Sequence, residues 1–532
     1  MDRPDPPTRS REGQPEADIL AALADPSTYG LTDPVAVCET HASWVFLAGP
    51  WAYKVKKPVR LAFLDYSTLA LRRAACGEEL RVNGELGGDI YRAVLAVLAG
   101  TDGVRFAPEG TPGAAEYVLQ MRRFDERLTL AGAITDGRLQ DSDLDAVARR
   151  IASFHAAAPS SRGGGGEATL RAWQVNLDEL EEVDPELLPI AAARRFGEAF
   201  VDGHRHELDR RAASGLVRDG HGDLRCEHVL LEQQVLVVDR IEFDPALRRI
   251  DVGWDLAFLL MDLQLRGQAT GADRLLRTYR HAGGDPGSEE LVWFFAAYWA
   301  LVRAKVEGIA ASQHRPDPSH GEPARAHELG ALAERLCWRA RGPVAVVVAG
   351  PPASGKSTLA GHLSKLSGLP IVSSDVTRKR LAGLTSIERG PAELYTHERS
   401  IETYRALGEA VARHFAEHRG VVLDATCGTR DQRAELLGAL AHDPRGLLFV
   451  ECRVPLACAL ERSAARMAQP EHVSDATPEV VSRLFDAYEE IRELPGASVV
   501  AVDGRASLDA QVEAVAARAD ALLACSDAPV TT

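Results

Sequence analysis

The stretch Gly350-Pro-Pro-Ala-Ser-Gly355-Lys356-Ser357 has the residue types and spacing of a phosphate-binding loop, G-x-x-x-x-G-K-[ST]. In such a loop, backbone N–H groups and the start of the following helix converge on an anion. Lys356 would reach the β- and γ-phosphates, and the Ser357 hydroxyl would bind Mg²⁺. A glycine turn without a ligand is the alternative. We predict a nucleoside triphosphate site made of Gly350, Pro351, Pro352, Ala353, Ser354, Gly355, Lys356, Ser357 and Thr358.

Acidic residues that follow apolar runs supply candidates for proton transfer and metal binding. Asp375 follows one such run and could accept a proton from a hydroxyl group, while Arg378 holds the acceptor. Capping of a helix is the alternative role of Asp375. Asp424 follows the next run and would face the Mg²⁺ of the loop, directly or through water.

Two arginines, Arg462 and Arg466, lie four residues apart and therefore on one face of a predicted helix. The segment 469–475 that follows is polar and is predicted to be mobile. This arrangement suits a lid whose arginines neutralise a phosphoryl group during its transfer. A solvated helix face is the alternative.

A second set of candidate catalytic and metal-binding residues lies in the first half of the chain. Asp223, in His221-Gly-Asp223, is separated by an apolar strand from Asp239, so a hairpin would bring both to one Mg²⁺–ATP. Asp223 would then orient the acceptor hydroxyl and Asp239 would hold the metal. Lys54 and Lys56 alternate onto one face of a predicted strand, where a helical Glu79 could pair with one of them. That strand and the one before it flank a Gly-Pro turn.

The elements that would position the loop alternate between strand and helix. A β-branched run over 343–349 precedes the loop, and a helix follows it from Thr358. Further strands are predicted over 369–373, 420–423, 447–451 and 498–502. Five strands with helices between them indicate an α/β fold with a parallel sheet, whose ligands bind at the carboxyl ends of the strands.

Length and composition limit the class of protein. A chain of 532 residues is long enough for about two to four domains. The Pro-rich stretch 313–323 divides it. We expect a disordered leader over 1–17, a domain over 18–312, a linker and connecting helix over 313–340, a domain over 341–527 and a tail over 528–532.

The net charge and the cysteine content indicate which binding partners and which cellular compartment to expect. The net charge of −16 argues against general nucleic-acid binding. No apolar run reaches the roughly 18 residues of a membrane-spanning helix, so no membrane partner is expected. The eight cysteines form no C-x-x-C pair, which favours a reduced cytoplasmic protein without a zinc site.

The ordered set of phosphate loop, Asp375, Asp424 and the arginine pair resembles the P-loop small-molecule and polynucleotide kinases, including relatives of the zeta toxins. The resemblance implies Asp375 as general base, Arg378 as an acceptor contact, and Arg462 and Arg466 as stabilisers of the transition state. It does not imply a polynucleotide substrate, because no basic and aromatic track is visible.

Residues 30–310 resemble the aminoglycoside phosphotransferase and protein-kinase-like fold. This resemblance implies Asp223 as catalytic base, Asp239 as magnesium ligand, Lys54 on the phosphates and Glu79 as its partner. It also implies that Asp251 and Asp255 brace the catalytic loop. The chain departs from that family at His228, where an asparagine usually serves as the second metal ligand. We expect His228 to take that place, although imidazole suits Mg²⁺ poorly.

The order of the two parts resembles bacterial fusions of an aminoglycoside phosphotransferase with an ATP-binding protein. The resulting prediction is an N-terminal α+β protein-kinase-like fold and a C-terminal α/β P-loop kinase. The preferred function is transfer of the γ-phosphoryl group of ATP, with Mg²⁺, to a hydroxyl of a small molecule at two kinase-type sites. The alternatives are a nucleotide-gated sensor with an N-terminal pseudokinase, and a 5′-hydroxyl polynucleotide kinase. The oligomeric state stays open.

Overall fold

The computed structural model describes residues 14–61, 64–100, 103–313, 322–385, 388, 392–417, 420–438, 446–467 and 478–524. Contacts between residues divide the chain into two compact units. Unit 1 comprises 1–162 and 215–286, and unit 2 comprises 163–214 and 287–532. Helix α1 (Gln14–Ala24) begins inside the predicted leader, the rest of which, like the predicted tail, lies outside the described residues.

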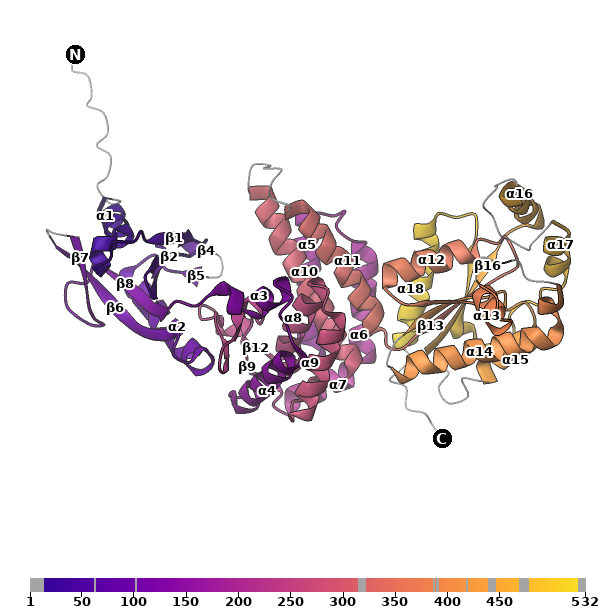
Figure 1. Cartoon of the computed structure of the whole chain (residues 1–532), viewed down its shortest axis with the longest axis horizontal. Helices are drawn as coiled ribbons and strands as arrows, with labels where there is room; N and C mark the ends of the chain where they lie inside the picture. The colour runs from indigo at the N-terminus through magenta and orange to yellow at the C-terminus, as the bar shows by residue number, and fades with distance from the viewer. Residues whose placement is uncertain are drawn as a thin grey trace, which may run out of the picture. The chain divides into compact units, whose positions relative to one another are not determined.

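Unit 1 contains a six-stranded antiparallel sheet in the order β1-β2-β3-β8-β6-β7 (Figure 1). Its strands are β1 (Ala36–Glu39), β2 (Ser43–Ala48), β3 (Trp51–Lys56), β6 (Tyr91–Gly100), β7 (Gly103–Pro108) and β8 (Glu116–Arg122). Short pairs are formed by β4 (Arg60–Leu61) with β5 (Leu64–Asp65), β9 (Val217–Asp219) with β12 (Arg249–Asp251), and β10 (Val229–Leu231) with β11 (Val235–Val237). The other helices are α2 (Leu69–Gly87), α3 (Leu130–Thr135), α4 (Asp141–Ala157), α8 (Val252–Leu265) and α9 (Ala269–His281).

Both faces of the six-stranded sheet are covered. Successive residues of β8 point to opposite faces: Val118 packs in one apolar cluster with Ile19 of α1, and Leu119 packs in another with Cys76 of α2. This period of two fixes the register, because a shift by one residue would exchange the two faces. The sheet thereby holds β3, which carries Lys54 and Lys56, against α2.

Unit 2 contains a five-stranded sheet in the order β14-β15-β13-β16-β17, and its strand pairs are all parallel. The strands are β13 (Ala345–Ala349), β14 (Ile371–Ser373), β15 (Val421–Asp424), β16 (Leu447–Arg453) and β17 (Val499–Asp503). The helices around it are α12 (Lys356–Ser367), α13 (Ser374–Leu381), α14 (His397–Ala416), α15 (Arg430–Gly438), α16 (Leu456–Met467), α17 (Pro478–Asp486) and α18 (Leu508–Ala524). The five predicted strands and the predicted parallel sheet are confirmed.

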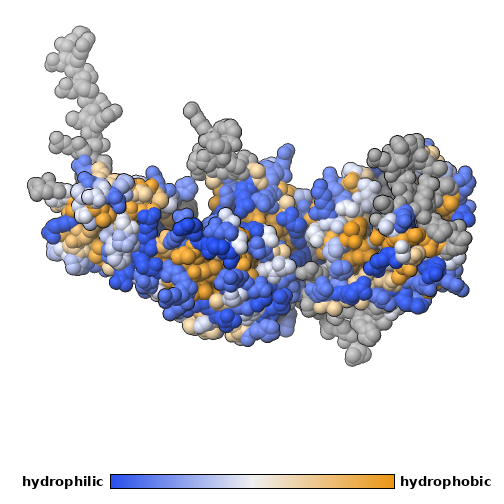
Figure 2. Space-filling model, viewed as in Figure 1, coloured by the Kyte–Doolittle hydropathy of each residue, from blue (hydrophilic) through white to orange (hydrophobic). Residues whose placement is uncertain are grey.

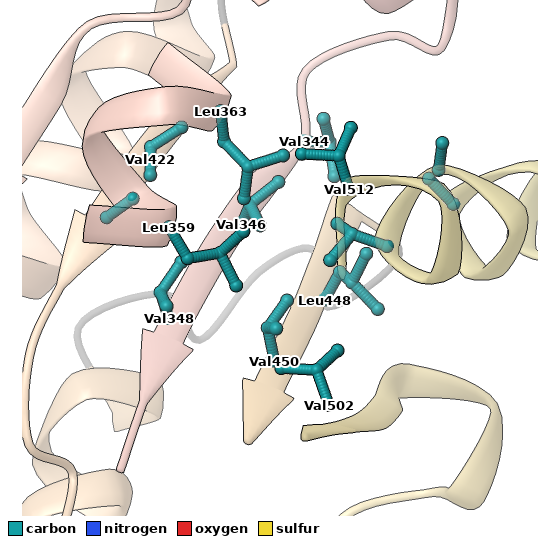
Figure 3. Packing of buried hydrophobic residues seen from close by; sticks show 14 of the residues in the cluster. Val344, Val346, Val348, Leu359, Leu363, Val422, Leu448, Val450, Val502 and Val512 are labelled. Carbon is teal, nitrogen blue, oxygen red and sulfur yellow. The ribbon is translucent and has the colours of Figure 1, made fainter. Parts of the chain in front are cut away.

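The central strand β13 is buried along its whole length, as expected for a parallel strand covered on both faces. Val346 and Val348 pack on one face against Leu359 and Leu363 of α12 (Figure 3). Val347 packs on the opposite face in a second cluster with residues of α14. The two clusters fix the strand end from which the phosphate loop begins.

Unit 2 also contains α5 (Gly166–Val183), α6 (Ile190–Gly203), α7 (Arg205–Ala213), α10 (Glu289–Gln313) and α11 (Glu322–Ala340). The guanidinium of Arg339 on α11 lies 3.6 Å from the ring of Trp293 on α10. The buried Asp520 of α18 accepts hydrogen bonds from Arg195 of α6 (2.9 Å) and Arg341 (2.8 Å). These contacts group helices from both sides of residue 320 into one unit, so the compact units do not divide at the predicted boundary.

The surface is mixed in character. Hydrophilic side chains are interspersed with hydrophobic patches on the face drawn in Figure 2. In the described part of the chain, no helix combines the length and the apolar character needed to cross a membrane.

Candidate active sites

The phosphate loop joins β13 to α12, and Lys356 is the first residue of that helix. Gly350 has a φ of +144° and Gly355 a φ of +98°, values that side chains disfavour. A Cβ atom at Gly350 would lie 2.7 Å from the carbonyl oxygen of Cys452. Glycine is therefore required at Gly350 by conformation and by the close approach of β16, and at Gly355 by conformation.

Two buried polar atoms near this loop have no hydrogen-bond partner among the described residues: Ser354 Oγ and Asp424 Oδ1. Asp424 ends β15 and pairs in register with Val348, next to the start of the loop. Burial raises the pKa of the Cys452 thiol to about 12, with Lys356 and Asp424 acting in opposite directions. Asp424 therefore lies beside the strand end that leads into the loop, where an unpaired carboxylate oxygen and a phosphate loop fit a metal-bound nucleotide.

Asp375 lies in the first turn of α13, and the N-cap of that helix is Ser373. The alternative prediction, that Asp375 caps this helix, is therefore wrong. Its carboxylate pairs with Lys379 Nζ at 3.0 Å and is 48% exposed, which leaves it open to a ligand. Arg378, predicted beside it, lies 5.0 Å from the ring of Tyr395, and its Nε atom is buried with no hydrogen-bond partner in the described part of the chain.

Arg462 binds backbone carbonyl groups in and beside the phosphate loop. Its guanidinium donates to the carbonyl oxygens of Gly504 (2.8 Å) and Ser354 (3.3 Å). A solvated face is thus the wrong description of this residue, which ties α16 to the loop. The side chain of Arg466 and the predicted mobile segment 469–475 lie outside the described residues, so the lid stays a prediction.

In unit 1 a buried carboxylate connects both lysines of β3. Glu79 of α2 is 1% exposed, and its two oxygens lie 2.7 Å from Lys54 Nζ and 2.6 Å from Lys56 Nζ. The sequence predicted a pair with one of the lysines. Lys56 is buried and also pairs with Glu242, whereas Lys54 is partly exposed and lies 3.5 Å from Asp239 Oδ1. Lys54 is therefore the lysine that faces the predicted metal ligand.

Asp239 follows β11 in a left-handed conformation with a φ of +61°. Its backbone N–H donates to the hydroxyl of Tyr91 at 3.0 Å. The neighbouring Lys54 holds the pKa of Asp239 well below its ordinary value. Asp239 is therefore ionised over the whole physiological range, as a metal ligand must be.

The loop that carries Asp223 is braced by Asp255, as the resemblance implied. The buried carboxylate of Asp255 accepts the N–H groups of His221 (2.6 Å) and Gly222 (2.9 Å). It also lies 3.1 Å from His155 Nε2. Asp251, expected to share this task, accepts the N–H of Gly253 at the start of α8.

Arg225 is a site residue that the sequence reasoning missed, although it lies only two positions after Asp223. Its Nε and Nη2 atoms donate to the two oxygens of Asp223 at 2.8 and 3.0 Å. His228 Nδ1 lies 2.8 Å from the carbonyl oxygen of Asp223, and its Nε2 lies 3.6 Å from Asp239 Oδ2. Asp223, His228 and Asp239 each offer one ligand atom within 4.8 Å of the others. The structure therefore brings the predicted base and both predicted metal ligands together.

Similar sequences are known both for most of the chain and for its C-terminal part. A family model described as "AAA domain" matches residues 346–491. The chain is 31% identical over 462 residues to the uncharacterized proteins Mb2027c of Mycobacterium bovis and Rv2004c of Mycobacterium tuberculosis, covering 85% of this chain and 89% of each relative. It is 32% identical over 130 residues to a shikimate kinase of Rhodococcus jostii, covering 24% of this chain and 69% of that enzyme.

Solved structures that resemble the chain include two kinases. A choline/ethanolamine kinase family protein from Mesorhizobium loti shares 16% identity at a TM-score of 0.36, covering 60% of this chain and 94% of that protein. A gluconokinase from Sinorhizobium meliloti shares 25% identity at a TM-score of 0.26, covering 33% of this chain and 92% of that protein.

The two predicted fold classes are confirmed by the architecture. The antiparallel sheet with its Lys54–Glu79 pair, followed by the loop of Asp223 and Asp239, is protein-kinase-like. The parallel sheet with its phosphate loop is a P-loop kinase fold. Since the sequence identity extends over most of both chains, this protein belongs to the family of the mycobacterial proteins Rv2004c and Mb2027c.

Proposed function

We propose that this protein moves the γ-phosphoryl group of ATP to a hydroxyl group of a small molecule. The observation that carries the proposal is the phosphate loop beside the buried, unpaired Oδ1 atom of Asp424. A phosphate loop alone serves many nucleotide-binding proteins. A carboxylate oxygen left without a partner at the adjacent strand end is the ligand expected for the divalent cation of a nucleotide complex.

In unit 2, Ser357 and Asp424 would hold Mg²⁺, which neutralises charge on the phosphates when bound. Lys356 and the loop N–H groups would orient the γ-phosphate. The half-exposed Asp375 takes the proton from the acceptor hydroxyl, and Arg378 positions the acceptor. The acceptor oxygen forms the new O–P bond as the bond between the γ-phosphorus and the bridging oxygen breaks, and ADP leaves with that electron pair.

In unit 1 the same reaction class is proposed for a second site. Lys54, held by Glu79, would contact the phosphates of ATP, and Asp223 would accept the proton of an acceptor hydroxyl. Asp239 and His228 would hold the metal of this site. Arg225 fixes the orientation of Asp223 through its two hydrogen bonds, a positioning role that the sequence did not suggest.

The test is an ATP-dependent screen of hydroxyl-bearing metabolites, including a 5′-hydroxyl oligonucleotide. Loss of the loop lysine in Lys356→Ala should lower phosphoryl transfer by roughly 10²–10³-fold, the range for removal of one charge-stabilising donor. Lys365→Ala is the matched control, because Lys365 is an exposed lysine of the same helix α12. Equal transfer by both variants would refute the role of the loop.

A second function, a nucleotide-gated sensor with a catalytically idle unit 1, is favoured by one observation. Arg225 donates to both oxygens of Asp223, the proposed base, and therefore competes with an acceptor hydroxyl for that carboxylate. Asp223→Asn separates the two functions. Loss of one phosphorylated product supports two kinase sites, whereas an unchanged set of products supports the sensor. Glu227→Gln is the control, since Glu227 contacts Arg225 at 2.9 Å from its other side.

A further inference from the structure

The tautomer of His228 follows from its two neighbours. Arg225 Nη2 lies 3.2 Å from His228 Nε2, and a guanidinium can only donate. His228 Nε2 must therefore accept, so it carries the lone pair. The hydrogen is then on Nδ1, which donates to the carbonyl oxygen of Asp223 at 2.8 Å. This second hydrogen bond fixes the orientation of the ring, as is common for metal-binding histidines.

The lone pair of His228 faces the carboxylates of the proposed metal site. Two ligands of one ion, each at about 2.1 Å, lie at most about 4.2 Å apart. The 3.6 Å between His228 Nε2 and Asp239 Oδ2 is within that limit. Asp223, His228 and Asp239 each offer one ligand atom, and these three atoms lie within 4.8 Å of one another. One nitrogen and two oxygens can therefore converge on a single ion after a small closure of Asp223.

The guanidinium of Arg225 already occupies the proposed metal position. The Nη2 atom of Arg225 lies 3.0 Å from Asp223 Oδ2 and 3.2 Å from His228 Nε2, where it uses the lone pairs that a metal ion would use. The guanidinium is thus a stand-in for a cation and a competitor for it. An ion must displace Arg225 from His228 to bind there.

We propose that the site of Asp223, His228 and Asp239 selects a first-row transition ion such as Mn²⁺ or Zn²⁺ over Mg²⁺, in competition with Arg225. This inference rests on the proposed function, in which Asp239 and His228 hold the metal of unit 1, and adds Asp223 as a third ligand and the kind of metal that binds. Imidazole nitrogen is a good ligand for transition ions. Mg²⁺ is held mainly by oxygen and loses water reluctantly, so it gains little from His228.

The experiment measures binding of Mn²⁺ to the full chain without nucleotide. Loss of the free Mn²⁺ signal in electron paramagnetic resonance gives the affinity, and Mg²⁺ is added as competitor. All samples carry Ser357→Ala and Asp424→Asn, which remove both proposed metal ligands of unit 2. Pulsed spectra of the bound Mn²⁺ then report coupling to a nitrogen nucleus, which only a nitrogen ligand produces.

Two variants should change the affinity in opposite directions. His228→Asn should weaken Mn²⁺ binding by roughly 10–100-fold, the range typical of changes around metal ligands, remove the nitrogen coupling and leave Mg²⁺ affinity no lower. Arg225→Gln should tighten Mn²⁺ binding by about tenfold or more, because the competing charge is gone. Circular dichroism checks folding. Asp239→Asn is a third variant, and it should also weaken Mn²⁺ binding.

Equal affinities for Mn²⁺ and Mg²⁺, or bound Mn²⁺ without nitrogen coupling in the chain with an intact His228, would overturn the inference. The measurement needs no turnover, so it is separate from the test of phosphoryl transfer. Nitrogen-bound Mn²⁺ in a chain that transfers no phosphate would overturn the proposed function and leave this inference standing. Transfer with Mg²⁺ and no nitrogen-bound ion would do the reverse.

Discussion

Replacing Glu79 by glutamine should destabilise the sheet of unit 1 far more than its small change in shape suggests. The Glu79 carboxylate is 1% exposed and neutralises Lys54 and Lys56, of which Lys56 is 2% exposed. A glutamine keeps the volume and some hydrogen bonds but removes the negative charge that both lysines share. Lys56 retains Glu242 and Lys54 retains Asp239, so the lysines keep one acidic partner each.

The expected magnitude follows from this geometry. Removing one partner of a buried ion pair typically costs ~3–5 kcal/mol. Because Lys56 and Lys54 keep Glu242 and Asp239 as partners, we expect a cost for Glu79→Gln near the lower end of this range, about 3 kcal/mol. This corresponds to roughly a hundredfold change in the equilibrium constant for opening of the sheet. The matched control is Glu167→Gln. Glu167 pairs with Arg171 at 3.0 Å, but both side chains are more than two-thirds exposed, so its loss should cost about 0–1 kcal/mol.

Native-state hydrogen exchange measured by mass spectrometry is the assay, because it reports the opening of β3 and α2 separately from unit 2. Amides of β3 should exchange roughly a hundredfold faster in Glu79→Gln, and those of β13 should be unchanged. If β3 amides exchange at the same rate in Glu79→Gln and Glu167→Gln, the reasoning about this buried charge cluster is refuted.

Two further predictions concern the phosphate loop and pH. A Cβ atom at Gly504 would lie 2.2 Å from the carbonyl oxygen of Ser354, so Gly504→Ala should weaken ATP binding by calorimetry roughly tenfold. Gly496→Ala, with nothing within 4 Å, should not, and equal affinities would contradict the packing argument. Burial lowers the pKa of His221 from 6.5 to about 4. Between these pH values the folded state therefore binds fewer protons than the unfolded state. The free energy of unfolding of unit 1 should then fall by up to ~3 kcal/mol as the pH falls from 6.5 to 4. Hydrogen exchange of the β10 amides at several pH values measures this loss of stability. The loss should be smaller in His221→Asn. If it is the same in that variant, groups other than His221 cause it.

Features encoded locally were predictable from the sequence. The short, valine-rich run before Gly350 predicted a buried strand, because a strand covered on both faces is continuously apolar instead of alternating. The alternation of Lys54 and Lys56 placed both on one face of β3, which the structure confirms through Glu79. Such patterns depend on the period of the backbone and not on distant partners.

Features that depend on distant segments were not predictable. The hydrogen bonds of Arg462 to the loop join residues more than a hundred positions apart. The bidentate contact of Arg225 with Asp223 is local, but a flexible arginine two positions from an aspartate has many rotamers, and the sequence does not show which one the fold selects. The grouping of α6 with α18 through Asp520 likewise needs three segments that no short pattern connects.

The central claim, transfer of a phosphoryl group from ATP, is tested most directly with ATP labelled at the γ-phosphorus. The full chain is incubated with pools of hydroxyl-bearing metabolites, and labelled products are separated from ATP and inorganic phosphate. We expect a labelled metabolite that Lys365→Ala still forms and that Lys356→Ala forms at a rate lower by roughly 10²–10³-fold. Label released only as inorganic phosphate, or a product formed equally by both variants, would contradict the account.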